Sequence, residues 1–219
     1  MDKTMQRGSL EMVAAMLISG TIGWLVLLSG QAVLDVVFWR CVFGAATLLV
    51  ICGLMGFLRP GLLNRHTFGL IVLSAVAIVA NWVLLFASYS RASIAIGTAV
   101  YNVQPFILLG LAALFLGEKI TLQKLAWLAV SFVGMLAIVS AHQGQGESGN
   151  QYLLGIALAL SAALMYAVAV LIIKRLRGVP PHLIALIQVS TGVLLLAPMA
   201  NFSELPAGTQ AWSSLLTLG

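Results

Sequence analysis

Long apolar runs with almost no charge follow one another along this chain, and they constrain its fold more than any other feature. A helix needs about 20 apolar residues to cross about 30 Å of hydrocarbon, so a run of 18 or more predicts a membrane span. Seven complete runs cover roughly residues 10–28, 33–55, 68–90, 93–116, 122–141, 152–173 and 183–200, and an eighth begins near Trp212. Only 8% of the residues are charged and 61% are hydrophobic, whereas about a quarter are charged in soluble domains. The sequence therefore predicts an all-α integral membrane protein.

The positions of the basic residues predict the orientation of the chain, because cytoplasmic segments carry an excess of Lys and Arg. With a cytoplasmic N-terminus, the inner segments hold nine of the 11 basic residues: Lys3, Arg7, Arg59, Arg65, Lys119, Lys124, Lys174, Arg175 and Arg177. The two longest outer segments, 142–151 and 201–210, hold none. We therefore expect a multi-pass protein of the cell inner membrane with its N-terminus in the cytoplasm.

A segment rich in Gly, Gln and Ser, "HQGQGESGNQ" at 142–151, separates the fifth run from the sixth. Such a composition is typical of a flexible linker. Five is an odd number of crossings, so a second copy of the same unit would enter the membrane in the opposite direction, as in inverted-repeat transporters. We expect one five-helix transmembrane repeat at 1–141, an external linker at 142–151 and an incomplete second transmembrane repeat at 152–219.

An alignment of the chain with itself favours this duplication. At an offset of 148 residues, Gly44 falls on Gly192 and Arg40 falls on Gln188. Two complete five-helix units would have ten helices. The sequence therefore predicts an inverted repeat of which about seven and a half helices are present.

Small residues recur at every fourth position of the sixth run: Gly155, Ala159, Ala163 and Ala167. Small side chains let helices approach closely in a membrane, where packing drives helix association. We expect this stripe to pack against another helix of the same chain and not against a second copy, and we favour a monomer.

Three stretches resemble a known family. The stretch "SYSRASIAIGTAVYNVQPFILLGLAALFLGEKITLQKLAWLAVSFVGMLAIVS" combines a helix with a central proline, an "LGE" ending and a short turn into the next helix, and "FWR" and "GIALALSAALMYAV" fit the same pattern. The sequence resembles EamA-type members of the drug/metabolite transporter superfamily. This resemblance implies a ten-helix protein of two inverted five-helix units, which moves small metabolites through a central cavity, often outward and often amino acids.

Polar residues and a proline interrupt the fourth run near its middle, in "AVYNVQPFILLG" at 99–110. Pro105 has no N–H for the carbonyl of Tyr101, and its ring pushes that carbonyl away, so we predict a bend and assign Pro105 a hinge or structural role. A freed carbonyl inside a membrane is tolerated only where protein or a wet cavity satisfies it. Gly97, Tyr101, Gln104 and Pro105 would share one face of a continuous helix. We expect that face to line a cavity, or to bond neighbouring helices through its amides.

Four runs place aromatic or polar groups at similar depth in the outer half of the membrane. Arg40 and Tyr101 lie about seven or eight residues inside their runs, which corresponds to about 10 to 12 Å at 1.5 Å per residue. Asn81 and Trp82 lie at a similar depth in the third run. The candidate substrate-binding residues are Trp24, Trp39, Arg40, Asn81, Trp82, Tyr101, Asn102, Gln104, Tyr166 and Gln188.

Arg40 is the most informative of these residues, because a guanidinium inside a membrane is costly and is often functional. Asp35, the nearest carboxylate, lies about 140° around the helix and is a poor partner. Arg40 could bind a substrate carboxylate, bond the carbonyl freed by Pro105, or extend outward to the surface as an anchor. No Asp or Glu lies in the middle of a complete run. The sequence therefore favours a substrate with its own carboxylate and an apolar or aromatic body over a lipophilic cation.

Glu118 follows the fourth run within "LGEK". A negative charge at the C-terminus of a helix opposes the helix dipole. We therefore expect a cationic partner, either Lys119, Lys124 or a basic residue on another loop, and we assign Glu118 a hinge or structural role.

The sequence contains no arrangement typical of catalysis or metal binding. The three histidines lie in loops or at the ends of runs, and no nucleophile stands beside a base. We expect no enzymatic activity, no cofactor and no nucleic-acid partner; the expected partners are a small-molecule substrate and the lipid bilayer. The favoured function is outward transport of amino acids, aromatic ones included, by alternating access. The alternatives are an importer of a vitamin or nucleobase-like metabolite and a non-transporting membrane subunit.

Overall fold

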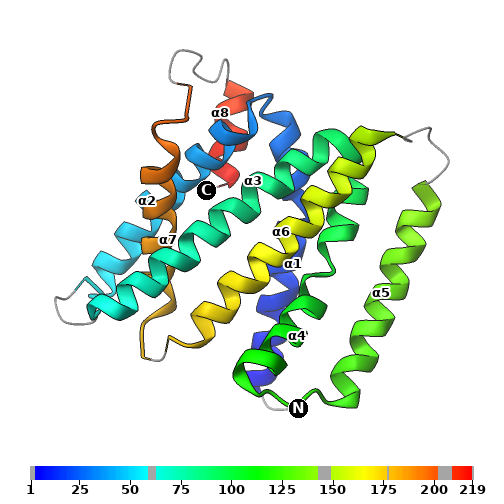
Figure 1. Ribbon diagram of the computed structural model, residues 1–219. Helices are drawn as coiled ribbons and strands as arrows, with labels where there is room; N and C mark the ends of the chain where they lie inside the picture. Colours follow the sequence, from blue (N-terminus) through cyan, green and yellow to red (C-terminus); the bar gives the residue numbers. More distant parts are fainter. Residues whose placement is uncertain (1–2, 59–62, 143–148, 177, 202–208, 219) are drawn as a thin grey trace.

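The computed structural model describes residues 3–58, 63–142, 149–176, 178–201 and 209–218, and every regular element in this part of the chain is an α-helix (Figure 1). In chain order the helices are α1 (Lys3–Leu28), α2 (Val33–Leu54), α3 (Arg65–Tyr101), α4 (Gln104–Leu116), α5 (Leu122–His142), α6 (Asn150–Lys174), α7 (Pro181–Leu196) and α8 (Thr209–Leu218). Most of the predicted external linker, residues 143–148, lies outside the described residues.

Three of these helices, α2, α3 and α6, are long and apolar enough to cross a membrane. Among the described residues, α4, α7 and the stretch Leu122–Gly134 of α5 are apolar but shorter. The predicted fold class is confirmed, since the protein is an all-α membrane protein. The number of crossings and the inverted repeat stay predictions.

The helix α3 contains a sharp break at Ala92 and Ser93, where the backbone is not helical. Ala92 has φ −130° and ψ 19°, and Ser93 has φ 62° and ψ 159°. A Cβ atom on Gly97 would lie 2.7 Å from the Ser88 Oγ atom, although nine residues of straight helix span about 13 Å. The two arms of α3 therefore fold back against each other (Figure 1). The break falls between the third and fourth predicted runs.

A second interruption precedes Pro105. Helix α3 ends at Tyr101, and Asn102 adopts φ −65° and ψ 0°. Helix α4 begins at Gln104 and has the proline in its first turn. Proline is tolerated there because the first N–H groups of a helix have no intrahelical partner. The chain thus forms two helices where the sequence predicts one bent helix.

The small residues of α6 pack on α3, which confirms the prediction that the stripe is used within the chain. Gly155, Ala159, Ala163 and Ala167 are all buried, and α6 contacts α3 along most of its length. A Cβ atom on Gly155 would lie 2.6 Å from the Cβ atom of Ala92. The close approach of these two helices therefore depends on the missing side chain at this position.

Two pairs of contacts between helices match each other. Helix α2 packs on α7, α3 packs on α6 and α7, and α8 contacts α1 and α2. If α6, α7 and α8 correspond to α1, α2 and α3, the contact α3–α6 matches α8–α1 and the contact α3–α7 matches α8–α2. Pro181, the first residue of α7, follows Val33, the first residue of α2, by 148 positions. This spacing agrees with the offset of 148 found in the sequence.

Candidate functional site

The guanidinium of Arg40 lies over the ring of Trp82, with its central carbon 4.6 Å from the ring centroid. Arg40 is on α2, whose residues Val36, Val37 and Cys41 are fully buried and hold the helix against its neighbours. Such an arrangement is a cation–π interaction, which attracts the charge to the face of the indole. Among the described residues, Arg40 has no hydrogen-bond or ion-pair partner.

Asp35, the carboxylate closest to Arg40 in sequence, has a different partner. It is only 7% exposed, and its Oδ1 atom accepts a hydrogen bond of 2.8 Å from the backbone N–H of Asn201. This contact ties the first turn of α2 to the segment that follows α7. The carboxylate thus stabilises a connection between helices and does not neutralise Arg40.

Asn81 is 1% exposed, and neither its Nδ2 nor its Oδ1 atom has a hydrogen-bond partner among the described residues. The Tyr101 side chain is close enough to interact with Asn81, but no hydrogen bond of normal geometry forms. Buried polar groups are nearly always paired, and an unpaired one costs about 1–3 kcal/mol. A buried amide with both ends unpaired among the described residues is a place where a polar ligand or water can bind. The buried Oε1 atom of Gln104 also has no hydrogen-bond partner in the described part of the chain.

Three tyrosines surround this region. Tyr101 and Tyr166 are edge to face, with ring centroids 6.2 Å apart, and they join the second arm of α3 to α6. Tyr89 is 7% exposed and lies within electrostatic range of Arg40 and Tyr101. The sequence analysis missed Tyr89, although it follows Trp82 by seven residues, a spacing that places two residues on one face of a helix.

Buried polar residues recur at every seventh position of α3: Ser74, Asn81 and Ser88, with 0%, 1% and 0% exposure. Ser74 and Ser88 donate hydrogen bonds to the carbonyls of Ile71 and Leu85. Both serines are thus satisfied within the helix. Asn81 is the member of this stripe that has no partner among the described residues.

The remaining candidates occupy other parts of the structure. Trp39 contacts Trp212 of α8 edge to face, with ring centroids 5.1 Å apart. Gln188 donates a hydrogen bond of 2.9 Å from Nε2 to the Ser74 Oγ atom, which joins α7 to α3. Trp24 is 62% exposed on α1, and Asn102 is exposed at the turn between α3 and α4. The group around Arg40 thus comprises Asn81, Trp82, Tyr89, Tyr101 and Tyr166, and we call it the Arg40 cluster.

Glu118 forms an ion pair with Lys174, with 2.8 Å between Oε1 and Nζ. The pair joins the loop after α4 to the last residue of α6. The sequence predicts a cationic partner in Lys119, Lys124 or a basic residue on another loop; the partner is a basic residue from another part of the chain, but it lies at the end of a helix. The hydrogen bond from Lys174 is the main reason that the pKa of Glu118 is lowered from its usual value, and the charges of Lys174 and Lys124 act in the same direction. Glu118 is therefore ionised at neutral pH.

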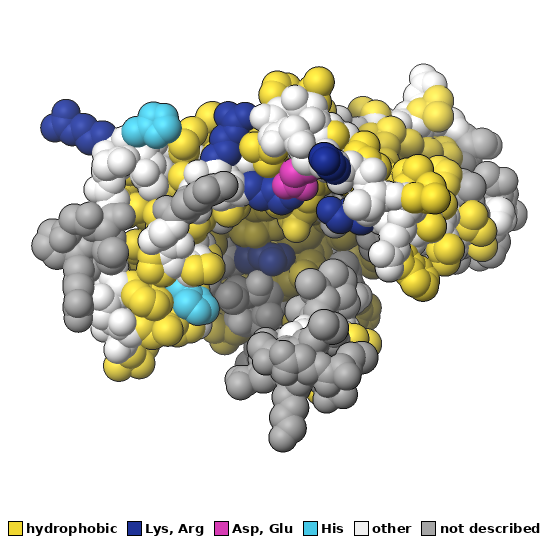
Figure 2. All heavy atoms as spheres, turned by 90° about the horizontal axis from the view of Figure 1, so that it is seen from below, with side chains coloured by type: hydrophobic (Ala, Val, Ile, Leu, Met, Phe, Trp, Pro, Cys, Tyr) yellow, Lys and Arg dark blue, Asp and Glu magenta, His cyan; other side chains and the backbone are white. Residues whose placement is uncertain are grey.

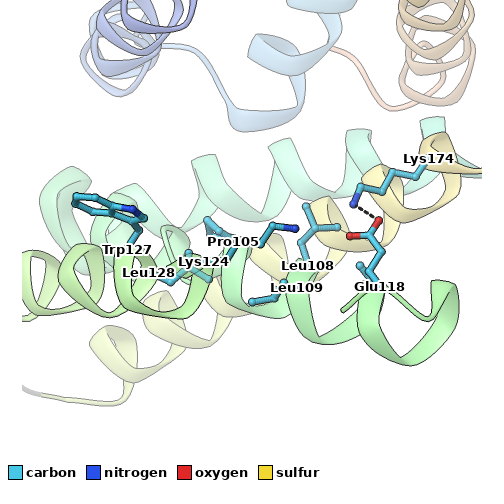
Figure 3. A pocket seen from close by; sticks show the side chains of 9 residues that line it. Pro105, Leu108, Leu109, Glu118, Lys124, Trp127, Leu128 and Lys174 are labelled. Atoms are coloured by element: carbon cyan, nitrogen blue, oxygen red, sulfur yellow. Dashed lines mark hydrogen bonds and ion pairs between the residues drawn. The ribbon is translucent and has the colours of Figure 1, made fainter. Parts of the chain in front are cut away.

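Pro105 lines a pocket of about 420 Å³ between α4, α5 and the end of α6 (Figure 3). The other lining residues are Leu108, Leu109, Ala112, Glu118, Lys124, Trp127, Leu128 and Lys174. The sequence analysis expected Pro105 to share a face with Tyr101. The interruption at Asn102 separates them, since Tyr101 contacts Tyr166 while Pro105 contributes to this pocket.

Basic side chains gather on the face of the molecule seen from below in Figure 1, around a hollow with an acidic side chain at its edge (Figure 2). The C-terminal ends of α2, α4 and α6 lie on this side of the molecule (Figure 1). This distribution agrees with the charge asymmetry in the sequence.

The fold defines an all-α membrane protein with charged and polar residues inside its helical bundle, and comparison with known proteins identifies the family. The model of the EamA-like transporter family matches residues 6–140. The chain therefore belongs to the EamA-like transporter family.

Two similar proteins extend the match over nearly the whole chain. An uncharacterized transporter of Bacillus subtilis (strain 168), YxxF, is 27% identical over 212 residues, which are 96% of this chain and 68% of the relative. A protein of known crystal structure has the same fold with a TM-score of 0.68 at 19% identity, over 94% of this chain and 74% of the other. The predicted family is thus confirmed.

Proposed function

We propose that this transporter carries amino acids, aromatic ones included, outward across the inner membrane by alternating access. The observation that carries the proposal is a pair of open groups in the Arg40 cluster: among the described residues, the guanidinium has no protein anion and the buried amide of Asn81 has no hydrogen bond. A substrate that supplies an anion and a polar group would satisfy both.

The chemistry of the Arg40 cluster suits the two ends of an amino acid. A guanidinium binds a carboxylate through two parallel charge-assisted hydrogen bonds. The carbonyl oxygen of Asn81 can accept a hydrogen bond from an ammonium group, and its nitrogen can donate one to a carboxylate. The rings of Trp82, Tyr101 and Tyr166 offer apolar and aromatic surface to a side chain.

Alternating access is supported by the matching pairs of helix contacts and by the two interruptions of the backbone. Transporters with inverted repeats move one unit against the other around a central site. Ser93 and Asn102 flank the second arm of α3, which carries Tyr101. Rotation at these two positions would move Tyr101 relative to Arg40, and Pro105 lies just beyond the second position.

An importer of a planar heterocycle, such as a nucleobase-like compound or a vitamin, is the second candidate. It is favoured by the unpaired amide of Asn81, because an amide can both donate to and accept from the edge of a heterocycle. The tyrosine and tryptophan rings could stack on its faces. The direction of net flux and competition by amino acids separate the two candidates.

Uptake of radiolabelled tryptophan into proteoliposomes, with a panel of amino acids as competitors, tests the proposal. We expect saturable flux whose KM rises about ten- to a hundredfold in Arg40→Gln, the factor that corresponds to a hydrogen bond to a charged group. Arg91→Gln is the matched control, because Arg91 is exposed and bonds only the carbonyl of Ala87 within its own helix. Flux of no amino acid, or equal KM values in both variants, would contradict the proposal.

A further inference from the structure

The pocket between α4, α5 and the end of α6 is separate from the Arg40 cluster and shares none of its residues. Its volume of about 420 Å³ falls within the range of small-ligand pockets. Leu108, Leu109 and Leu128 form an apolar wall, and Pro105 also lines the pocket. The ligand must therefore have a long or bulky apolar part.

Charged residues stand on another part of the lining. Lys174 forms an ion pair with Glu118. Lys124 has no ion-pair partner among the described residues, and it interacts with Glu118 only by longer-range electrostatic attraction. Figure 3 shows the ammonium group of Lys124 pointing toward Leu108 and the Glu118–Lys174 pair. Two ammonium groups face one carboxylate, so the charged part of the lining has one excess positive charge.

The surroundings of the pocket are apolar and exposed, as expected for a surface in contact with hydrocarbon. Leu114 and Phe115 of α4 are 76% and 56% exposed, and Leu122 and Trp127 of α5 are 82% and 69% exposed. Helix α5 stands at the edge of the bundle (Figure 1). A ligand therefore reaches this pocket most directly from within the bilayer.

We propose that this pocket binds a membrane phospholipid with an anionic headgroup. The phosphate lies between Lys124 and Lys174, and one acyl chain runs along Leu108, Leu109 and Leu128 toward Pro105. Basic pockets between helices on the cytoplasmic side of a membrane recognise anionic headgroups by this combination of charge and apolar surface. The bound chain would fill the space between α4 and α5 and would contact Pro105, next to the interruption of the backbone. Binding of the lipid does not depend on which substrate is carried.

Quenching of tryptophan fluorescence by brominated lipids tests this proposal, because Trp127 lines the pocket. The protein is reconstituted in phosphatidylcholine vesicles that contain a fixed fraction of either brominated phosphatidylglycerol or brominated phosphatidylcholine. The signal of Trp127 is obtained by subtracting the spectrum of Trp127→Phe. We expect the anionic lipid to quench Trp127 with an apparent affinity about fivefold higher than the neutral lipid, the factor that corresponds to one lysine near an anionic headgroup.

Two lysine variants separate a specific site from general attraction to an anionic membrane. Lys124→Gln should remove the preference for phosphatidylglycerol. Lys119→Gln should keep the preference for phosphatidylglycerol, because Lys119 is exposed in the loop between α4 and α5 and does not line the pocket. Equal quenching by the two lipids, equal effects of the two variants, or no quenching of Trp127 by either lipid would overturn the proposal.

Discussion

The guanidinium of Arg40 on α2 lies 4.6 Å from the ring centroid of Trp82 on α3. This contact places a positive charge inside a helical bundle without a carboxylate beside it among the described residues. The indole face supplies part of the stabilisation that water would give to the charge.

Trp82→Leu should weaken both the fold and the binding of substrate. Loss of the cation–π contact should lower the free energy of unfolding by about 0.5–2 kcal/mol, and the KM for transport should rise because the orientation of Arg40 is lost. Thermal unfolding in detergent and flux in proteoliposomes measure the two effects. Trp127→Leu is the control for loss of an indole, since Trp127 is 69% exposed; similar melting temperatures for both variants would contradict the contact.

Asn81→Leu should leave the protein as stable as before or make it more stable, while it impairs transport. The amide of Asn81 has no hydrogen bond among the described residues, so its replacement by an apolar group of similar size removes a penalty of about 1–3 kcal/mol. Ser74→Ala should instead destabilise the protein, because the Ser74 hydroxyl bonds both Ile71 and Gln188. Melting temperatures of the two variants, with flux measured in parallel, check this prediction. A large loss of stability in Asn81→Leu would show that the amide is bonded.

Ser93→Gly should stabilise the protein. Ser93 has φ 62° and ψ 159°, a region that is open to glycine and costs other residues about 1–3 kcal/mol. Part of this gain is offset by loss of the hydrogen bond from the Ile96 N–H to the Ser93 hydroxyl, which is long at 3.4 Å. Ser140→Gly on α5 is the control and should destabilise by about 0.5–1 kcal/mol, because there glycine replaces a residue inside a helix. Denaturation curves that shift in the same direction for both variants would contradict the strained conformation.

Gly155→Val should disrupt the packing of α6 on α3. A Cβ atom at this position would lie 2.6 Å from the Ala92 Cβ atom and 2.9 Å from the Ala92 backbone nitrogen, so the backbone must shift. Overpacking of this kind costs about 1–3 kcal/mol or more. Gly110→Val is the matched control, since nothing lies within 4 Å of its Cβ position. Comparison of the two melting temperatures checks the prediction, and a Gly155 variant as stable as the Gly110 variant would contradict it.

The Glu118–Lys174 pair should make stability fall at acidic pH. The pKa of Glu118 is lowered in the folded protein by its hydrogen bond with Lys174 and by the nearby charges of Lys174 and Lys124. The pair therefore stabilises the protein above the unfolded-state pKa, about 4.3 for Glu, and this contribution is lost as the pH falls through the lower folded-state pKa. Melting temperatures of the wild type and Glu118→Gln should differ at pH 7 and converge below about pH 4. A difference that does not change with pH would contradict the role of the carboxylate charge.

Several parts of the candidate site could be predicted from the sequence because they depend on local pattern. Arg40, Asn81, Trp82 and Tyr101 stand out as polar or aromatic residues at similar depth in apolar runs, and Pro105 stands out as a helix breaker. The small residues of α6 recur with helical periodicity, which indicated a close contact with another helix. Hydropathy and periodicity report which residues are unusual and which share a face, and both are properties of a single helix.

The partners of these residues could not be predicted in the same way. Nothing local indicates that Trp82 lies under Arg40, that Glu118 pairs with Lys174 or that Trp39 contacts Trp212. Each contact joins helices that are far apart in the chain or separated by a turn. It depends on the angle and rotation at which the helices cross, and these are set by the packing of all the side chains between them.

The sequence by itself determined that this protein is an all-α membrane protein, because the length and spacing of apolar runs leave few other structures possible in a bilayer; its membership of the EamA-like transporter family follows from the family match over residues 6–140. Only the tertiary structure decided that the fourth run divides before Pro105, so that Tyr101 joins the Arg40 cluster while Pro105 lines a different pocket. The reason is physical: a helical face exists only while the helix is continuous. The two residues between α3 and α4, Asn102 and Val103, change the direction in which the side chains after them point.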